Sequence, residues 1–303
     1  MYKYASKIET EYYNKMYELI ENPKKKYGEY RKCEFHIHTP SSNCYRFIKC
    51  EGKEEELENT HSHKHLSIDD VVNYSIECGY MTYNMYEKYL ENKEYFSTED
   101  YLKELRAQKV PYDSFKEYIM FMTIAHKLYN EKIEIAVISD HNTIDGYAKL
   151  EYAVDKYYKE RVTPFGKRIE VILGVEISCA DRVHLVVIYD KEKKEELQTY
   201  LTKNIKDSRF GTIKNSMEVI KDMQQHPAIS YIAHINSLTL ANTGLYKQEL
   251  FSQKGLKGIG ITNIETIERE LNKVNELRKT IDDISVIHEG DSHSINDIGL
   301  KNC

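Results

Sequence analysis

The sequence predicts an α/β protein in which helices cover a largely parallel sheet. Two observations lead to this class: seven short apolar runs rich in β-branched residues recur along the chain, and segments of helical period separate most of them. The length of 303 residues allows one large domain with a substantial core. We therefore expect a single domain over residues 1–303, with a sheet that is either open or closed into a barrel.

Each expected strand is an apolar run of five to ten residues, short enough to be a strand and bounded by polar residues or glycine. The runs are CEFHIHT, IEIAVIS, IEVILGVEIS, VHLVVIY, ISYIAHI, GIGIT and ISVIHEG, at residues 33–39, 133–139, 169–178, 183–189, 229–235, 258–262 and 284–290. Amphipathic helical segments lie among them, at residues 114–132, 147–161, 191–203, 213–225 and 266–281, and one more helix is expected at the N-terminus.

The first run carries two histidines, His36 and His38, two positions apart. Side chains at i and i+2 of a strand point to the same side, so both rings are expected to face one spot. Two neutral imidazoles that converge in this way favour a divalent metal site. A pair of core histidines bonded to the backbone is an equally good interpretation of the pair in isolation.

Ionisable residues also occur at the ends of most other expected strands. In sheets of this class, ligands bind at the carboxyl ends of the strands. Buried charges and imidazoles are unfavourable unless they bond to one another or to a metal. Each residue alone could be structural, but the set together predicts a shared site. It consists of Asp140, His141, Glu176, His184, His234, Asp291 and His293.

Composition excludes several classes of protein. With 43 Lys and Arg against 49 Asp and Glu, the net charge is -6, so there is no global basic footprint for nucleic acid. The N-terminal segment has no continuous apolar stretch, which argues against a signal peptide or a membrane span and favours a cytoplasmic protein. Six cysteines without a Cys-x-x-Cys pair argue against a disulfide framework or a zinc knuckle.

Taken in order, FHIHTPSS, ISDHNTIDG, GVEIS, HLVVIY, IAHIN and GDSHS resemble the motifs of the PHP (polymerase and histidinol phosphatase) family of metal-dependent phosphoesterases. The longer stretches RKCEFHIHTPSS, SDHNTIDGY and GDSHSINDIG are similar to the N-terminal PHP module of TrlF-like proteins, which precedes an SMC-like or AAA-like ATPase. The resemblance implies a distorted (β/α)7 barrel, the PHP fold, with two or three divalent metal ions (Mn2+, Zn2+ or Fe2+) at the carboxyl ends of the strands.

Carried over by motif, the resemblance assigns ligands to three metals. His36, His38 and Asp291 would hold the first metal, and Glu176 would bridge it to the second. His184 and His234 would complete the second site. The third would take His141 and His293, and the position that is His or Asp in the family is Cys44 here. Thiolate suits zinc better than manganese, so either Cys44 makes this site zinc-like or the site is weak and fills with substrate.

The chemistry expected of such a centre is hydrolysis of a phosphoester bond. Closely spaced divalent cations lower the pKa of a bridging water, so that metal-activated hydroxide is available near neutral pH, and they clamp the phosphoryl oxygens. We see no nucleophile elbow and no P-loop. The resemblance places Asp140, Glu176 and Asp291 in catalytic roles, with Asp140 orienting a ligand or a water.

About a hundred residues separate His38 from Asp140, so a helical insertion is expected at residues 45–112, where it could form a lid beside the site. Within it, His61, His63 and His65 could form a metal patch, but a solvated loop is the better interpretation of such a polar, charged segment. Tyrosines of the insertion could stack bases.

The resemblance favours a phosphodiesterase or nuclease with a nucleic acid or nucleotide as substrate, and it implies a place in an ATPase-linked antiviral defence system. One alternative is a small-molecule phosphomonoesterase like histidinol phosphatase. Another is an inactive PHP scaffold that docks an ATPase. An SMC/AAA-like ATPase would then be a separate partner chain. A basic cluster at residues 203–214 could contact phosphates.

Overall fold

The computed structural model describes residues 31–48, 63–162, 166–237, 244–278 and 284–300. The contacts divide the chain into two units, residues 1–31 and 32–303. Apart from Arg31, all described residues belong to the second unit, and the following account concerns that unit alone. The helix expected at the N-terminus lies outside the described residues.

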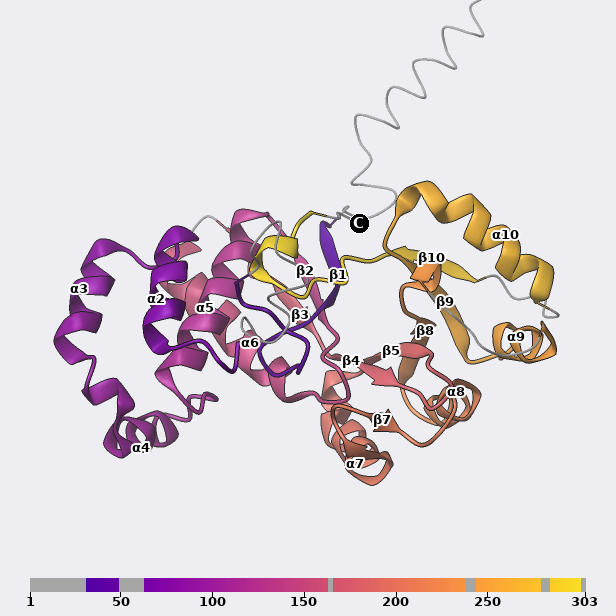
Figure 1. Cartoon of the computed structure of the whole chain (residues 1–303), viewed down its shortest axis with the longest axis horizontal. Coiled ribbons are helices and arrows are strands. Elements are labelled where there is room, and N and C mark those ends of the chain that lie inside the picture. Colours follow the sequence, from indigo (N-terminus) through magenta and orange to yellow (C-terminus); the bar gives the residue numbers. More distant parts are fainter. Residues whose placement is uncertain (1–30, 49–62, 163–165, 238–243, 279–283, 301–303) are drawn as a thin grey trace, which may run out of the picture. The chain divides into compact units, whose positions relative to one another are not determined.

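Two sheets contain all seven expected strands, which confirms the α/β class (Figure 1). In the first sheet, β1 (Cys33–Ile37), β2 (Ile135–Ile138) and β3 (Glu170–Ile172) are parallel. The second sheet has the order β10-β9-β8-β5-β4, made of β4 (Gly174–Ser178), β5 (His184–Tyr189), β8 (Ala228–Ile232), β9 (Leu256–Ile261) and β10 (Ser285–His288).

The direction of β5 departs from the expected parallel arrangement. It runs antiparallel to β4 and to β8, whereas β8, β9 and β10 are mutually parallel. The connection from β4 to β5 spans residues 179–183, which is too short for a crossover helix but sufficient for a hairpin. Because β5 is reversed, its first residue, His184, lies at the same edge as the carboxyl ends of the parallel strands.

Two seams join the sheets. At one seam, a single residue, Leu173, separates β3 from β4, and a parallel bridge pairs His141 with Glu176. At the other seam, a parallel bridge pairs Ile37 with Ser292, and the His38 amide donates to the Ser292 carbonyl (2.9 Å). The segments that follow β1, β2 and β10 therefore meet beside β4.

The five helices expected among the strands are present in the predicted order. An unexpected hairpin, β6 (Ile205–Asp207) and β7 (Gly211–Thr212), and an unexpected helix, α9 (Gly244–Phe251), lie between them. The five are α5 (Phe115–Asn130), α6 (Asp145–Tyr157), α7 (Lys194–Asn204), α8 (Ser216–Met223) and α10 (Ile267–Leu277). The chain also forms short helical turns, namely η2 (Tyr95–Ser97), η3 (Tyr158–Val162), η4 (Lys191–Lys193), η5 (Ile235–Ser237), η6 (Ile264–Thr266) and η7 (Ile295–Asp297).

The insertion is helical where it is described, with α2 (Ile68–Glu77), α3 (Tyr83–Asn92) and α4 (Glu99–Ala107). Each helix begins after a Ser or Thr whose side chain accepts from the first turn, as N-caps commonly do. The aromatic rings of Tyr89, Phe96 and Phe115 stack between the insertion and α5. Whether the insertion closes over the site as a lid stays a prediction.

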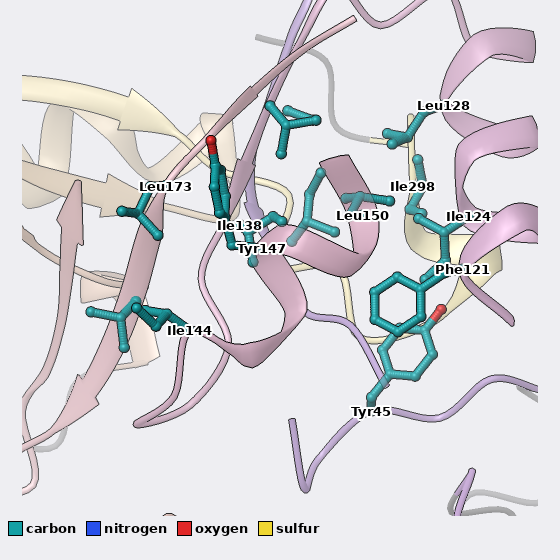
Figure 2. Packing of buried hydrophobic residues seen from close by; sticks show 14 of the residues in the cluster. Tyr45, Phe121, Ile124, Leu128, Ile138, Ile144, Tyr147, Leu150, Leu173 and Ile298 are labelled. Atoms are coloured by element: carbon teal, nitrogen blue, oxygen red, sulfur yellow. The ribbon is translucent and has the colours of Figure 1, made fainter. Parts of the chain in front are cut away.

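The core is continuous from the first sheet into α5 and α6. Figure 2 shows Phe121, Ile124 and Leu128 of α5 on one side of this core and Tyr147 and Leu150 of α6 on the other. Tyr45, from the start of the expected insertion, is fully buried and belongs to the same core cluster (Figure 2). None of the helices in the described ranges has the length and apolar character needed to cross a bilayer.

Candidate metal centre

The two histidines of the first expected strand converge, but not through the regular alternation of side chains along a strand. The register of β1 against β2 shifts between Glu34 and Ile37, and His36 has a φ of 68°. This irregularity replaces regular strand alternation, and bulges of this kind often re-aim side chains at functional sites. The rings of His36 and His38 are fully buried with centroids 5.0 Å apart.

The Glu176 carboxylate lies at the centre of the site, and five imidazoles surround it. Its Oε2 is 3.0 Å from His36 Nε2, 3.3 Å from His38 Nε2 and 3.2 Å from His141 Nδ1. Its Oε1 is 2.7 Å from His184 Nδ1 and 3.1 Å from His234 Nε2. The carboxylate of β4 is thus shared by imidazoles from β1, from β5 and from the segments that follow β1, β2 and β8.

Asp291 and His293 approach the same centre from the segment after β10. The Asp291 Oδ1 is 3.6 Å from His36 Nε2 and 3.7 Å from His38 Nε2. The His293 ring stacks on His38 with centroids 4.0 Å apart. Asp291 has a φ of 51° and His234 a φ of 31°, so His36 is not the only site residue with left-handed backbone.

Cys44 lies beside these histidines. Its Sγ is 3.7 Å from His38 Nδ1 and 3.1 Å from Ser42 Oγ. Ligand atoms of His38, Cys44, His141 and His293 all lie within 4.8 Å of one another. Burial alone would raise the pKa of the Cys44 thiol, but the charge of His38 and hydrogen bonds from the neighbouring imidazoles lower it to about 3. The sulfur is therefore held as a thiolate, the form that binds metals.

Charge complementarity also governs the protonation of Glu176. Burial would raise the pKa of this carboxyl, but the charge of His36 and hydrogen bonds from His184, His234 and His36 hold it well below its usual value. Conversely, burial lowers the pKa of His36, but Glu176 and Glu289 raise it to about 10. Glu176 therefore stays ionised, as a carboxylate ligand of a cation must.

The residues present fit a group of divalent metal ions. Three buried polar atoms of the cluster make no hydrogen bond to any residue that the structure describes, although partners are close: His38 Nε2, His141 Nδ1 and Asp291 Oδ1. Buried polar atoms without hydrogen bonds are rare and call for a ligand. Two further groupings within 4.8 Å, namely His36, His38 and Glu176, and His141, Glu176 and His184, offer the imidazole and carboxylate donors that zinc, iron and manganese accept.

Asp140 is fully buried beside the cluster, but both of its oxygens bind Thr39. The Thr39 amide donates to Oδ1 (2.6 Å) and the Thr39 hydroxyl donates to Oδ2 (2.7 Å). Burial raises the pKa of Asp140 to about 7, against the opposing effects of the charge on His38 and of the bonds from Thr39. In this structure Asp140 thus fixes the segment that leads from β1 to Cys44, and its catalytic role stays a prediction.

The sequence reasoning missed two buried glutamates. Glu289 accepts from His36 Nδ1 (2.9 Å) and from the His234 amide, so it orients one imidazole and the backbone of another. Glu34 accepts from the Ser292 hydroxyl (2.9 Å) and the Gly299 amide (3.1 Å). The available signal was a charged residue within or directly after an apolar strand run.

The interpretation of the HSHKH segment as a solvated loop was wrong for His63. This ring is buried and its Nδ1 bonds to the Tyr45 carbonyl (3.0 Å), because the segment packs onto the buried start of the insertion. His65 is exposed, as expected, and His61 lies outside the described residues.

The fold and the site together define a mixed α/β protein with a buried cluster of imidazole, carboxylate and thiolate groups suited to divalent metal ions. No family model matches the sequence. A protein of Streptococcus pneumoniae serotype 4 (strain ATCC BAA-334 / TIGR4), itself uncharacterized, is 30% identical over 254 residues, which cover 80% of this chain and 87% of the relative. The chain therefore belongs to the same family as this pneumococcal protein.

The chain is similar to several solved structures at low identity. PsfC from Pseudomonas syringae PB-5123 is 16% identical, with 61% of this chain and 71% of that chain covered and a TM-score of 0.41. A protein of Bifidobacterium adolescentis, provisionally named a metal-dependent phosphoesterase, is 15% identical (57% and 82% covered, TM-score 0.39). The lesion-specific endonuclease Q from Pyrococcus furiosus is 14% identical (58% and 44% covered, TM-score 0.42).

Proposed function

We propose that the chain is a metal-dependent hydrolase of phosphoester bonds of the PHP type, and specifically a phosphodiesterase or nuclease. The observation that carries this proposal is the convergence of five imidazoles on Glu176, beside Asp291 and Cys44. If the cluster served only as a structural network, its buried polar atoms would be expected to form hydrogen bonds with one another, yet three of them form none among the described residues.

The strand arrangement supports the distorted seven-stranded barrel of this fold. If β3 and β4 count as one bent strand, the two seams continue the order β1, β2, β4, β5, β8, β9 and β10 back to β1. The candidate ligands lie at one edge of this arrangement, which is where barrel enzymes place their chemistry.

In the proposed reaction, Glu176, Asp291 and the surrounding imidazoles would hold divalent cations, which would supply Lewis acidity to a water and to the phosphoryl oxygens. Glu176 and Asp291 hold negative charge between the imidazoles, which would offset the charge of more than one cation in a buried space. Glu289 fixes the ring of His36 through its Nδ1 (2.9 Å). Asp140 holds the segment that presents Cys44.

The finer parts of the proposal depend on the sequence resemblance. They are two or three ions of manganese, zinc or iron, kinship with TrlF-like modules, a separate SMC/AAA-like ATPase as partner, a cytoplasmic location, and a role in antiviral defence. Co-purification of the tagged chain with an ATPase from its own host would support the partner, and recovery of the chain alone would count against it.

The test joins metal analysis to hydrolysis. Purified protein should contain divalent metal by elemental analysis and should hydrolyse bis(p-nitrophenyl) phosphate after addition of manganese or zinc. Glu176→Gln removes one charge from the centre without changing its size, so we expect loss of bound metal and a fall in kcat of at least about a hundredfold. A phosphomonoester tested in parallel separates the diesterase from the phosphatase alternative.

The matched control is Glu87→Gln, an exposed glutamate of α3 that is expected to change neither metal content nor rate. Circular dichroism checks that both variants are folded. Wild-type protein that holds no metal, or a Glu176→Gln variant with full metal content and rate, would contradict the proposal.

A further inference from the structure

The β6–β7 hairpin stands at the rim of the metal centre. Its tip residue Ser208 accepts from Asn43 Nδ2 at Oγ (3.1 Å) and from Asn142 Nδ2 at its carbonyl (2.8 Å). These two asparagines directly adjoin Cys44 and His141, respectively, both in the candidate metal cluster. The hairpin tip is therefore fixed to the segments that present the cluster.

The hairpin also packs against β4 through β7. The same Asn142 that bonds to Ser208 accepts from the Ser178 amide at Oδ1 (2.9 Å), so it joins the hairpin tip to the end of β4. Gly211 has a φ of 77°, and a Cβ at this position would overlap the Ser178 carbonyl. Because only glycine suits such a close approach of two backbones, the hairpin is locked against the strand that carries Glu176.

The tip presents an aromatic ring to solvent. The side chain of Phe210 is 77% exposed, which is unusual for so large an apolar group. The Arg209 guanidinium lies 5.4 Å from the centre of this ring and forms a paired contact with Asp207 (Nη2 to Oδ2 2.8 Å, Nε to Oδ1 3.1 Å). The ring thus stands on a short, hydrogen-bonded turn that limits its motion.

Positive charge lies along the same rim. Lys64, an exposed residue of the insertion, donates from Nζ to the Asn43 side chain that also contacts the hairpin tip. Arg46 lines a cavity of about 340 Å³ together with Cys44 and His293. A rim that combines cationic side chains with one exposed aromatic ring matches a ligand that carries both phosphate and a flat base.

We propose, on the basis of the proposed phosphodiester hydrolysis, that Phe210 stacks on a base of a single-stranded nucleic acid and thereby places the adjoining phosphodiester at the metal centre. An alkyl phosphate ester has no flat group for this ring. The tyrosines of the insertion, which the sequence also offered for stacking, are poorer candidates where they are buried, as Tyr80 and Tyr89 are.

The experiment compares three substrates with one set of variants in the metal-loaded full chain. We expect Phe210→Ala to lower kcat/KM about tenfold on a single-stranded oligonucleotide, mainly through KM. On bis(p-nitrophenyl) phosphate, whose nitrophenyl rings are themselves flat, we compare kcat, which should be unchanged because stacking acts through binding and not at the metal centre. Phe210→Tyr keeps the ring and should restore the rate. Tyr83→Ala removes an equally exposed ring (75%) from α3 and tests whether a tyrosine of the insertion stacks the base instead: a loss equal to that of Phe210→Ala would count against the proposal, and an unchanged rate would support it. Thymidine 5′-p-nitrophenyl phosphate tests whether one nucleotide suffices.

Each outcome decides between the two proposals. If bis(p-nitrophenyl) phosphate is not hydrolysed, the proposed function fails, and binding of a labelled oligonucleotide, measured by fluorescence anisotropy, then tests Phe210 alone. Hydrolysis of the small diester with equal oligonucleotide rates and affinities for wild type and Phe210→Ala would overturn the stacking role. A loss confined to the mononucleotide would replace the nucleic acid by a free nucleotide.

Discussion

Cys44 brings a sulfur atom into a centre otherwise made of nitrogen and oxygen donors. Since its pKa is lowered to about 3 by the neighbouring imidazoles, the thiolate is present throughout the physiological pH range. Soft thiolate ligands favour zinc over manganese. The residue at this one position is therefore expected to influence which cation the cluster retains.

We predict that Cys44→Asp shifts the preference of the centre from zinc towards manganese. The ratio of the two affinities, measured by isothermal titration calorimetry on metal-free protein, should change by at least about tenfold, because even partners outside the ligand set alter metal affinity by about 10–100-fold. Cys78→Ser, at the end of α2 and half-buried, is the control. An unchanged zinc-to-manganese ratio would exclude sulfur from the site.

At the scale of residues, the sequence predicted which groups would meet but not how the backbone brings them together. Spacing identified His36 and His38, yet their convergence depends on the left-handed backbone of His36 within a strand, and no local sequence pattern predicts that conformation. Glu289 was missed because the side chain it serves, His36, lies more than two hundred residues away in the sequence.

The start of α6 depends on the absence of a side chain. A Cβ on Gly146 would overlap Asp140 Oδ2 and Thr39 Oγ1, the two groups that fix the segment after β1. We predict that Gly146→Ala destabilises the protein by about 1–3 kcal/mol, as overpacking typically does. The free energy of unfolding from urea titration measures this effect.

Gly244→Ala, at the first residue of α9, is the comparison. No described residue lies within 4 Å of a Cβ at that position, so the substitution should leave stability unchanged or raise it by up to about 1 kcal/mol. Equal effects at both glycines would show that the contact between Asp140 and Thr39 tolerates displacement.

At the scale of elements, apolar runs located the strands well, since burial selects β-branched residues wherever the strand lies. The direction of β5 could have been read from the five residues between β4 and β5, a length typical of hairpins. The β6–β7 hairpin could not be predicted in this way, because its short, charged strands carry no apolar pattern and are held by contacts with Ser178 and Asn142.

Stability of the whole unit should depend on pH through His126 of α5. This buried ring contacts the Tyr157 hydroxyl (2.8 Å) and the Cys78 carbonyl (3.1 Å), and so joins α5 to the ends of α6 and α2. Burial lowers its pKa below 6.5 despite the bond to Cys78. The folded state therefore disfavours the protonated ring, and stability that is complete above pH 6.5 is lost as the pH falls below that value.

We predict that His126→Gln removes this part of the pH dependence. The variant should be less stable than wild type by about 1–3 kcal/mol at pH 8, because two buried hydrogen bonds are disturbed, and the difference should shrink towards pH 5. Urea titrations at both pH values measure it. A difference that grows on acidification would mean that the folded state favours the charged ring.

For the whole molecule, the order of motifs along the chain predicted a shared site, because strand ends in one sheet meet at one edge. The sequence did not indicate that two sheets would form. That division depends on the bend at Leu173 and on the single bridges at Ile37 and His141, which are features of long-range packing.

The placement of the cluster across both seams has one more consequence. His141 and Glu176 lie on either side of one seam, and His38 and Asp291 on either side of the other. Any ion bound among these side chains would link the two sheets. Binding of metal should therefore also stabilise the contacts between the sheets at both seams, and these contacts should be weakest when no metal is bound.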